Sequence, residues 1–197
     1  MLGSTHLLFG MATLAAAEVT VQTVSGGSLW QPASAGNGAL LEPALGLAAV
    51  LLGSLAPDLD AEDSTIQREL GGCGQLTALG LKLIGVKHRG ILHSGLALLF
   101  VTGVAVGLGL RLGYPSTGLA FGLGYASHVV LADALTCTGV PLWWPARLHF
   151  HLLPGWLRVR TGGPAEKLVA LLVIALLVVL LPQAVPPSWL TLARRWR

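Results

Sequence analysis

Histidine and carboxylate side chains recur beside the apolar runs of this chain, and these residue types could bind a metal ion. His88 and His93 lie five residues apart, where a polar stretch turns into an apolar run. Imidazole and carboxylate together are ligands of zinc, manganese or iron rather than of magnesium alone. We therefore take these ionisable residues as candidate metal ligands or catalytic groups: His6, Asp58, Asp60, His88, His93, His128, Asp133 and Glu166.

The composition indicates where such residues would lie. The chain is 53% hydrophobic and 11% charged, whereas an ordinary soluble domain is roughly 25% charged. A soluble core formed by 197 residues could not hide this much apolar surface, so the lipid bilayer is the expected solvent. The net charge of +3 comes from Lys and Arg residues that flank apolar runs. This pattern argues against nucleic-acid binding, which needs a basic patch on a polar domain.

Five apolar runs predict an all-α, polytopic membrane helix bundle, with residues 1–197 forming a single domain. The predicted helices cover about residues 5–24, 39–56, 90–113, 116–139 and 166–187. No Lys or Arg precedes the first run, which favours a retained helix over a signal peptide. Tryptophans and arginines broken by prolines at 140–163 predict a segment in the membrane interface. A short interfacial helix is expected at about 76–84.

Alternating crossings would place all the candidate residues on one membrane face. The first, third and fifth helices begin on that face, and the second and fourth end there. These are the positions at which the candidates occur, so a single shared site is expected. Eight of the twelve Lys and Arg residues fall on the same face. By the positive-inside rule, the N-terminus and the site are therefore predicted to be cytoplasmic, in a multi-pass protein of the inner membrane.

Spacing leaves the number of metal ions open. His88–His93 and His128–Asp133 are both i, i+5 pairs, which an ideal helix places about 140° apart. One partner could then bind a metal while the other binds a second metal or positions the first. Alternatively, His88 precedes the helix and folds back. His149 and His151 are assigned to the interfacial segment instead.

A purely structural explanation is also available. Asp133 lies within an apolar run, where an unpaired carboxylate costs several kcal/mol. Arg89 could neutralise Asp60 or Asp133 in an ion-pair cluster that binds no metal. The gathering of so many ionisable residues on one face nevertheless favours a metal site.

A series of short motifs runs in order over nearly the whole chain: HLLF at 6–9, LAPDLD at 55–60, STI at 64–66, HRGILHS at 88–94 and GYASH at 124–128, followed by Asp133, Thr136, GVP at 139–141, WP at 144–145 and Glu166. On these motifs the chain resembles the YdjM family of predicted membrane-bound metal-dependent hydrolases. Two positions depart from the family pattern: Ala61 replaces a His after Pro-Asp-x-Asp, and Leu92 replaces a hydroxyl residue.

The resemblance implies a hydrolase that uses one or two divalent ions, zinc with manganese or iron as alternatives. Its expected metal ligands are Asp58, Asp60, His88, His93, His128 and Asp133. His6 and Glu166 would complete the shell or act as general base, and Arg89 would neutralise a phosphate. The location predicts a phosphoester of a lipid or a lipid-linked molecule as substrate. A divalent-metal transporter or sensor and a non-catalytic scaffold are the alternative functions.

Overall fold

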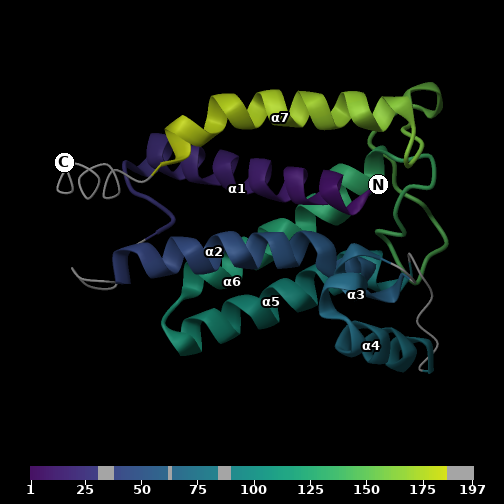
Figure 1. Ribbon diagram of the computed structural model, residues 1–197, viewed down its shortest axis with the longest axis horizontal. Helices are drawn as coiled ribbons and strands as arrows, with labels where there is room; N and C mark the ends of the chain where they lie inside the picture. The colour runs from purple at the N-terminus through teal and green to yellow at the C-terminus, as the bar shows by residue number, and fades with distance from the viewer. Residues whose placement is uncertain (31–37, 62–63, 84–89, 186–197) are drawn as a thin grey trace.

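The computed structural model describes residues 1–30, 38–61, 64–83 and 90–185 of the chain. Within these residues the secondary structure is helical, with two isolated bridges and no strand. Five helices are long and apolar enough to cross a membrane, and they run along the long axis of the molecule (Figure 1). The prediction of an all-α membrane bundle with five spanning helices is therefore confirmed.

The spanning helices follow the apolar runs of the sequence. They are α1 (Gly3–Ser25), α2 (Gly38–Leu55), α5 (Gly95–Leu112), α6 (Pro115–Ala126) and α7 (Pro164–Ala184). Three shorter elements extend two of them: the 3₁₀ turn η1 (Ala56–Asp60) after α2, and the π-helix η3 (Ser127–Ala132) and 3₁₀ turn η4 (Asp133–Leu135) after α6. The predicted ranges agree with these bounds to within a few residues.

Two predicted helix ends are displaced, and both displacements affect candidate residues. The sequence predicts a third helix from residue 90, but the 3₁₀ turn η2 (Ile91–His93) comes first and Ser94 caps α5. The Ser94 hydroxyl accepts a hydrogen bond from the Ala97 amide at 3.1 Å, as an N-cap residue does. The sequence predicts a fourth helix up to residue 139, but helical structure ends at Leu135. His93 and Asp133 consequently lie in turns at helix ends.

Helix α6 is the centre of the bundle, with α2 and α5 packed against it and α1 between α2 and α7. Two glycines allow α2 and α6 to approach closely. A Cβ atom on Gly53 would lie 2.1 Å from the Phe121 carbonyl oxygen, and one on Gly124 would lie 2.2 Å from the Val50 carbonyl oxygen. Small residues at such contacts are typical of helix packing in membranes. This packing fixes the end of α2 beside the end of α6, where candidate residues occur.

The outer helices α5 and α7 present apolar side chains to the surroundings. Leu99 and Phe100 on α5 are 73% and 72% exposed. Only 17% of the spanning window of α7 is buried inside the protein, against 61% for the α6 span. Outer helices of this kind require a lipid environment, because no soluble monomer exposes so much contiguous apolar surface.

Shorter segments cover the end of the bundle at which α1, α5 and α7 begin (Figure 1). They are α3 (Thr65–Leu70), α4 (Gly72–Leu83) and the connection 136–163, which contains the 3₁₀ turn η5 (Gly155–Leu157). The predicted interfacial helix at 76–84 corresponds to the second half of α4. Backbone hydrogen bonds between Val140 and Phe150, at 3.1 and 2.8 Å, hold the connection folded. Trp143 and Trp156 are exposed on it, at 63% and 82%.

Candidate metal centre

Six of the candidate residues that the structure describes come from five elements that meet at one end of the bundle. It is the end marked N in Figure 1, where α1 and α7 begin. The contributing elements are the first turn of α1 (His6), η1 (Asp58 and Asp60), η2 (His93), η3 (His128) and η4 (Asp133). Sequence positions from 6 to 133 therefore converge, as the alternation of five crossings predicts.

Two imidazoles and two carboxylates form the centre of this cluster. His93 Nε2 lies 3.6 Å from Asp58 Oδ1 and 3.6 Å from Asp133 Oδ2. His128 Nε2 lies 3.6 Å from the same oxygen of Asp58 and 3.7 Å from the same oxygen of Asp133. The side chains of both histidines are fully buried and that of Asp133 is 1% exposed, whereas Asp58 is 17% exposed. Four potential ligand atoms thus face one another, and only Asp58 reaches the surface.

These distances fit a shared metal ion better than direct hydrogen bonds. An N–H···O hydrogen bond spans about 2.7–3.2 Å, so contacts of 3.6–3.7 Å are too long. A zinc ion with ligands at about 2.0–2.2 Å places neighbouring tetrahedral ligands about 3.3–3.6 Å apart. His128 Nε2 is moreover buried without a hydrogen-bond partner among the described residues. The donor set and its spacing therefore fit a divalent cation.

The other ring nitrogens of the two histidines contact groups that can orient them. His128 Nδ1 lies 2.7 Å from the Ser54 carbonyl oxygen, so a proton on Nδ1 leaves the Nε2 lone pair for a metal. His93 Nδ1 lies 3.9 Å from Asp60 Oδ2. Metal-bound histidines commonly have such partners, which fix the ring and raise its basicity. The structure thus places Asp60 behind His93 and not among the four facing atoms, whereas the sequence predicts it as a ligand.

A π-helix explains how His128 and Asp133 reach the same site despite their i, i+5 spacing. On an ideal α-helix the two side chains would point about 140° apart. Residues 127–132 form the π-helix η3, and the Asp133 amide donates to the His128 carbonyl oxygen. Because π-helical hydrogen bonds join residues i and i+5, the two positions lie one above the other. Both side chains therefore face the cluster. The sequence-based expectation of diverging side chains is wrong for this pair.

His6 stacks on the cluster from the side of α1. Its ring lies 3.7 Å from the ring of His128, with an interplanar angle of 7°. His6 Nε2 is 3.6 Å from Asp133 Oδ1, and the Met1 amino nitrogen is 3.0 Å from the same oxygen. Neither ring nitrogen of His6 has a hydrogen-bond partner among the described residues. His6 thus offers a buried lone pair beside the four facing atoms.

Two overlapping groups of three ligands can be drawn: His6, His128 and Asp133, and Asp58, His93 and His128. Both need His128, whose Nδ1 already contacts a carbonyl oxygen. A neutral imidazole has one lone pair for a metal, so the two groups cannot both use His128 at once. One ion between His93 and His128 is the arrangement that uses the most facing atoms.

Glu166 is buried and accepts hydrogen bonds from two backbone amides, and its predicted role as a further ligand or general base stays a prediction. Its Oε1 accepts a hydrogen bond from the Leu2 amide and its Oε2 accepts one from the Gly162 amide, both at 2.6 Å. Both carboxylate oxygens are therefore occupied by backbone donors. Glu166 ties the start of α1 to the start of α7 and so holds His6 in position.

The remaining predicted residues fall into two groups. His88 and Arg89 lie outside the described residues, so their predicted roles stay predictions. His149 is exposed, and His151 Nδ1 lies 3.2 Å from the Thr136 carbonyl oxygen. Neither belongs to the two groups of potential ligands, in line with their assignment to the interfacial segment.

Tyr125 is a contributor whose role the sequence does not reveal. Its hydroxyl donates to the carbonyl oxygen of Leu92, the residue before His93. Tyr125 is 2% exposed and lies on α6, one turn before His128. This bond joins the η2 turn to α6 and brings the two histidines together. The sequence marks Tyr125 as part of the GYASH motif at 124–128 but does not reveal its contact with the η2 turn.

Comparison with known proteins supplies a family. The model of a family described as YdjM inner membrane protein matches residues 1–189. Inner membrane protein YdjM of Escherichia coli strain K12 is 38% identical over 105 residues, which cover 52% of this chain and 50% of that protein. The protein of the same name from Shigella flexneri has the same identity and coverage. This alignment spans about half the length of these curated relatives. No solved structure matches the chain.

Proposed function

Since this chain belongs to the YdjM family of inner membrane proteins, we propose that it is a membrane-embedded, metal-dependent hydrolase. The observation that carries the proposal is the set of four contacts of 3.6–3.7 Å between two imidazole nitrogens and two carboxylate oxygens. A buried cluster at these distances is satisfied when a cation lies within it. His128 Nε2 is buried without a hydrogen-bond partner among the described residues, so its lone pair is available to a cation.

The ligands of the proposed ion are Asp58, His93, His128 and Asp133. Asp60 orients His93 through Nδ1, and the Ser54 carbonyl oxygen orients His128. A divalent cation held there would act as a Lewis acid on a substrate oxygen and would activate water for hydrolysis. Zinc fits the donor set, and manganese or iron would accept the same ligands.

A hydrolase must leave room for water and substrate at its metal. Four protein ligands close a tetrahedral zinc site, whereas catalytic zinc keeps a position open or expands to five ligands. Asp58 is the only one of the four whose side chain is partly exposed, at 17%. We place the open side of the site there, because the other three ligands are enclosed by protein.

His6 is the proposed general base. It stacks on His128, it is 1% exposed, and its ring nitrogens have no hydrogen-bond partner among the described residues. A base needs a free lone pair within reach of the attacking water. Glu166, the other predicted base, is engaged by two backbone amides. It is better suited to holding His6 than to taking a proton.

The proposed substrate is a phosphoester of a lipid or of a lipid-linked molecule. The site lies where spanning helices end, beside a connection that exposes Trp143 and Trp156. Tryptophan side chains concentrate at the level of lipid headgroups. A phosphoester in a headgroup would therefore lie near the partly exposed edge of Asp58. Arg89, outside the described residues, stays the predicted phosphate partner.

The site is proposed to face the cytoplasm. If the five helices cross the membrane in alternating directions, eight of the twelve Lys and Arg residues lie at this end and four at the other. The positive-inside rule then assigns this end to the cytoplasm. Reporter fusions in the 71–80 segment and after residue 197 test this orientation. The expected result is a cytoplasmic loop and an external tail. A loop and tail on the same side would contradict the five-crossing topology and the role of His6.

Metal content is the experiment that tests the proposal. The full chain, purified in mild detergent, should contain about one divalent ion per polypeptide by elemental analysis. His93→Ala and Asp133→Asn should lose it. The matched control is His151→Ala, which removes a partly buried histidine of the 136–163 connection and should retain the metal. Hydrolysis of a panel of phospholipids and soluble phosphoesters should then depend on the same two residues.

Each other outcome selects a different function. A wild-type chain without stoichiometric metal would contradict the hydrolase proposal and favour a structural ion-pair cluster. Stoichiometric metal with no turnover on the panel, together with metal uptake by reconstituted vesicles, would favour a transporter.

A further inference from the structure

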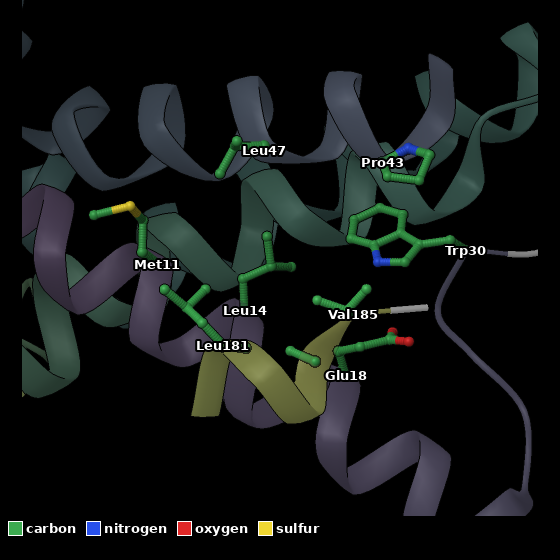
Figure 2. A pocket seen from close by; sticks show the side chains of 10 residues that line it. Met11, Leu14, Glu18, Trp30, Pro43, Leu47, Leu181 and Val185 are labelled. Atoms are coloured by element: carbon green, nitrogen blue, oxygen red, sulfur yellow. The ribbon is translucent and has the colours of Figure 1, made fainter. Parts of the chain in front are cut away.

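A second candidate binding site lies away from the candidate metal centre, in a cavity of about 270 Å³ between α1, α2 and α7. Figure 2 shows it from close by. Met11 and Leu14 from α1, Leu47 from α2 and Leu181 from α7 supply apolar walls, and Glu18 and Trp30 lie at one end. Glu18 is the only charged residue among those that line the cavity.

The cavity lies within the membrane-spanning part of the bundle. Leu14 is the middle residue of α1, and Met11 and Glu18 lie on either side of it. Glu18 is twelve residues from His6, or about 18 Å along a helix. The cavity therefore extends from the middle of the bundle towards the end opposite the metal centre. A ligand there would belong to the other membrane leaflet.

A hydrogen-bonded support holds the end of this cavity. The Glu18 carboxylate accepts hydrogen bonds from the Ser28 hydroxyl at 2.6 Å and from the Leu29 amide at 2.8 Å. These bonds fix the chain that carries Trp30. The indole of Trp30 then packs on Gly46 so closely that a Cβ atom there would lie 2.2 Å from the ring.

A buried carboxylate in a membrane span is costly and usually serves a purpose. Glu18 is 1% exposed. Its Oε1 also accepts a third hydrogen bond, from the side-chain Nε2 of Gln22 at 2.8 Å. With three donors in place, Glu18 positions the end wall and is not itself a headgroup ligand.

The cavity is continuous with the surface that faces the bilayer. Leu47 and Leu181 line it and are 46% and 52% exposed. Water is a poor occupant, because an ordered water needs two or more polar partners. The lining side chains are apolar except for Glu18, which already accepts three hydrogen bonds, and the indole N–H of Trp30. The hydrocarbon chains that already surround α2 and α7 are chemically matched to the walls.

We propose that this cavity binds one hydrocarbon chain of a membrane lipid, from the leaflet opposite the metal centre. The chain lies along α1 from Glu18 towards Met11, a length of about 10 Å at the rise of a helix, and Trp30 closes the outer end. The bound hydrocarbon chain would fill the cavity that lies between α1, α2 and α7. This site does not depend on metal binding or on hydrolysis.

A photoreactive phospholipid with a diazirine on its acyl chain tests the proposal. The full chain is reconstituted in vesicles of that lipid and phosphatidylcholine, irradiated, and its labelled peptides are mapped by mass spectrometry. Peptides with Met11, Leu14 and Leu47 should carry more label than the outer face of α5. Met11→Trp fills the cavity and should lower their labelling about tenfold, because overpacking opposes occupation.

The matched control is Val104→Trp, which adds the same side chain on the exposed face of α5 and should leave labelling of the cavity unchanged. Far-UV circular dichroism and the thermal unfolding temperature in detergent verify that both variants fold. Native mass spectrometry gives a second measurement, in which the wild type should retain one lipid more often than Met11→Trp does. Equal labelling of the cavity peptides and the α5 peptides would mean that the label comes only from the lipid around the protein. That result, or cavity labelling unaffected by Met11→Trp, would overturn the proposal.

Discussion

The two ends of the bundle both bury ionisable side chains within spanning segments, but they surround them differently. At the cavity end, Glu18 accepts three hydrogen bonds of 2.6–2.8 Å. At the metal centre, carboxylates and imidazoles face one another at 3.6–3.9 Å, beyond hydrogen-bond distance. Burial of a charged group in a membrane helix therefore does not identify a binding site by itself. The distances between partners distinguish the hydrogen-bonded Glu18 from the cluster that we propose binds a metal ion.

This difference has an energetic basis. A buried carboxylate with a full set of donors has exchanged its water for protein hydrogen bonds and can remain stable in a low-dielectric environment. In the candidate metal centre the imidazoles and carboxylates face one another beyond hydrogen-bond distance, and His128 Nε2 has no hydrogen-bond partner among the described residues. The metal centre is thus the region whose stability should change most when a cation binds.

Removing a ligand at the metal centre should have the largest effect. His128→Ala deletes the nitrogen that both groups of potential ligands require, and we expect metal affinity to fall by more than about 100-fold. Glu18→Gln, at the other end, should leave the metal affinity unchanged. Competition with a chromogenic chelator measures both variants. A Glu18→Gln variant that loses metal as well would break the distinction between the two ends.

Asp60→Asn should have an intermediate effect. Asp60 Oδ2 lies 3.9 Å from His93 Nδ1, behind the nitrogen that faces the ion. Removing its charge leaves all four facing atoms in place, so we expect a loss of about 10- to 100-fold in metal affinity, as for other groups that orient a metal-bound histidine. The same chelator competition measures it, with His151→Ala as control. A loss equal to that of His93→Ala would instead make Asp60 a direct ligand, as the sequence predicts.

Glu18→Ala should change stability and leave the metal unaffected. The substitution removes the acceptor for the Ser28 hydroxyl and the Leu29 amide. An unsatisfied buried donor costs about 1–3 kcal/mol, so we expect thermal unfolding in detergent several degrees below that of the wild type. Thermal shift assays with and without added zinc measure this. An unchanged unfolding temperature would contradict the structural role of this carboxylate.

The spanning helices could be predicted from the sequence, and so could the end of the bundle at which the candidate site residues meet. Apolar runs of about 20 residues have one stable form in a bilayer, and alternation then determines which ends meet. This alternation predicts that His6, Asp58, His93 and Asp133 lie together at one end of the bundle.

Local winding and side-chain partners could not be predicted in this way. The i, i+5 spacing of His128 and Asp133 indicates divergence on an α-helix, and only the π-helix η3 brings them to one face. Residue type predicts a catalytic or ligand role for Glu166 and does not show that two backbone amides donate to it. Likewise, a carboxylate within an apolar run does not reveal that Glu18 accepts hydrogen bonds from Ser28 and Leu29.

Tyr125→Phe should have the smallest effect, because it removes one hydrogen bond and no ligand. The Tyr125 hydroxyl holds the Leu92 carbonyl oxygen, and one such bond contributes about 1 kcal/mol, or roughly fivefold in an equilibrium constant. If that bond holds His93 in its metal-binding position, the loss should appear in metal affinity. Chelator competition should then show a fivefold weaker site in a variant with an unchanged number of bound ions. Thr117→Val, on the same helix but remote from the η2 turn, is the control. If Tyr125→Phe lowers the unfolding temperature and leaves metal affinity unchanged, the bond supports helix packing alone.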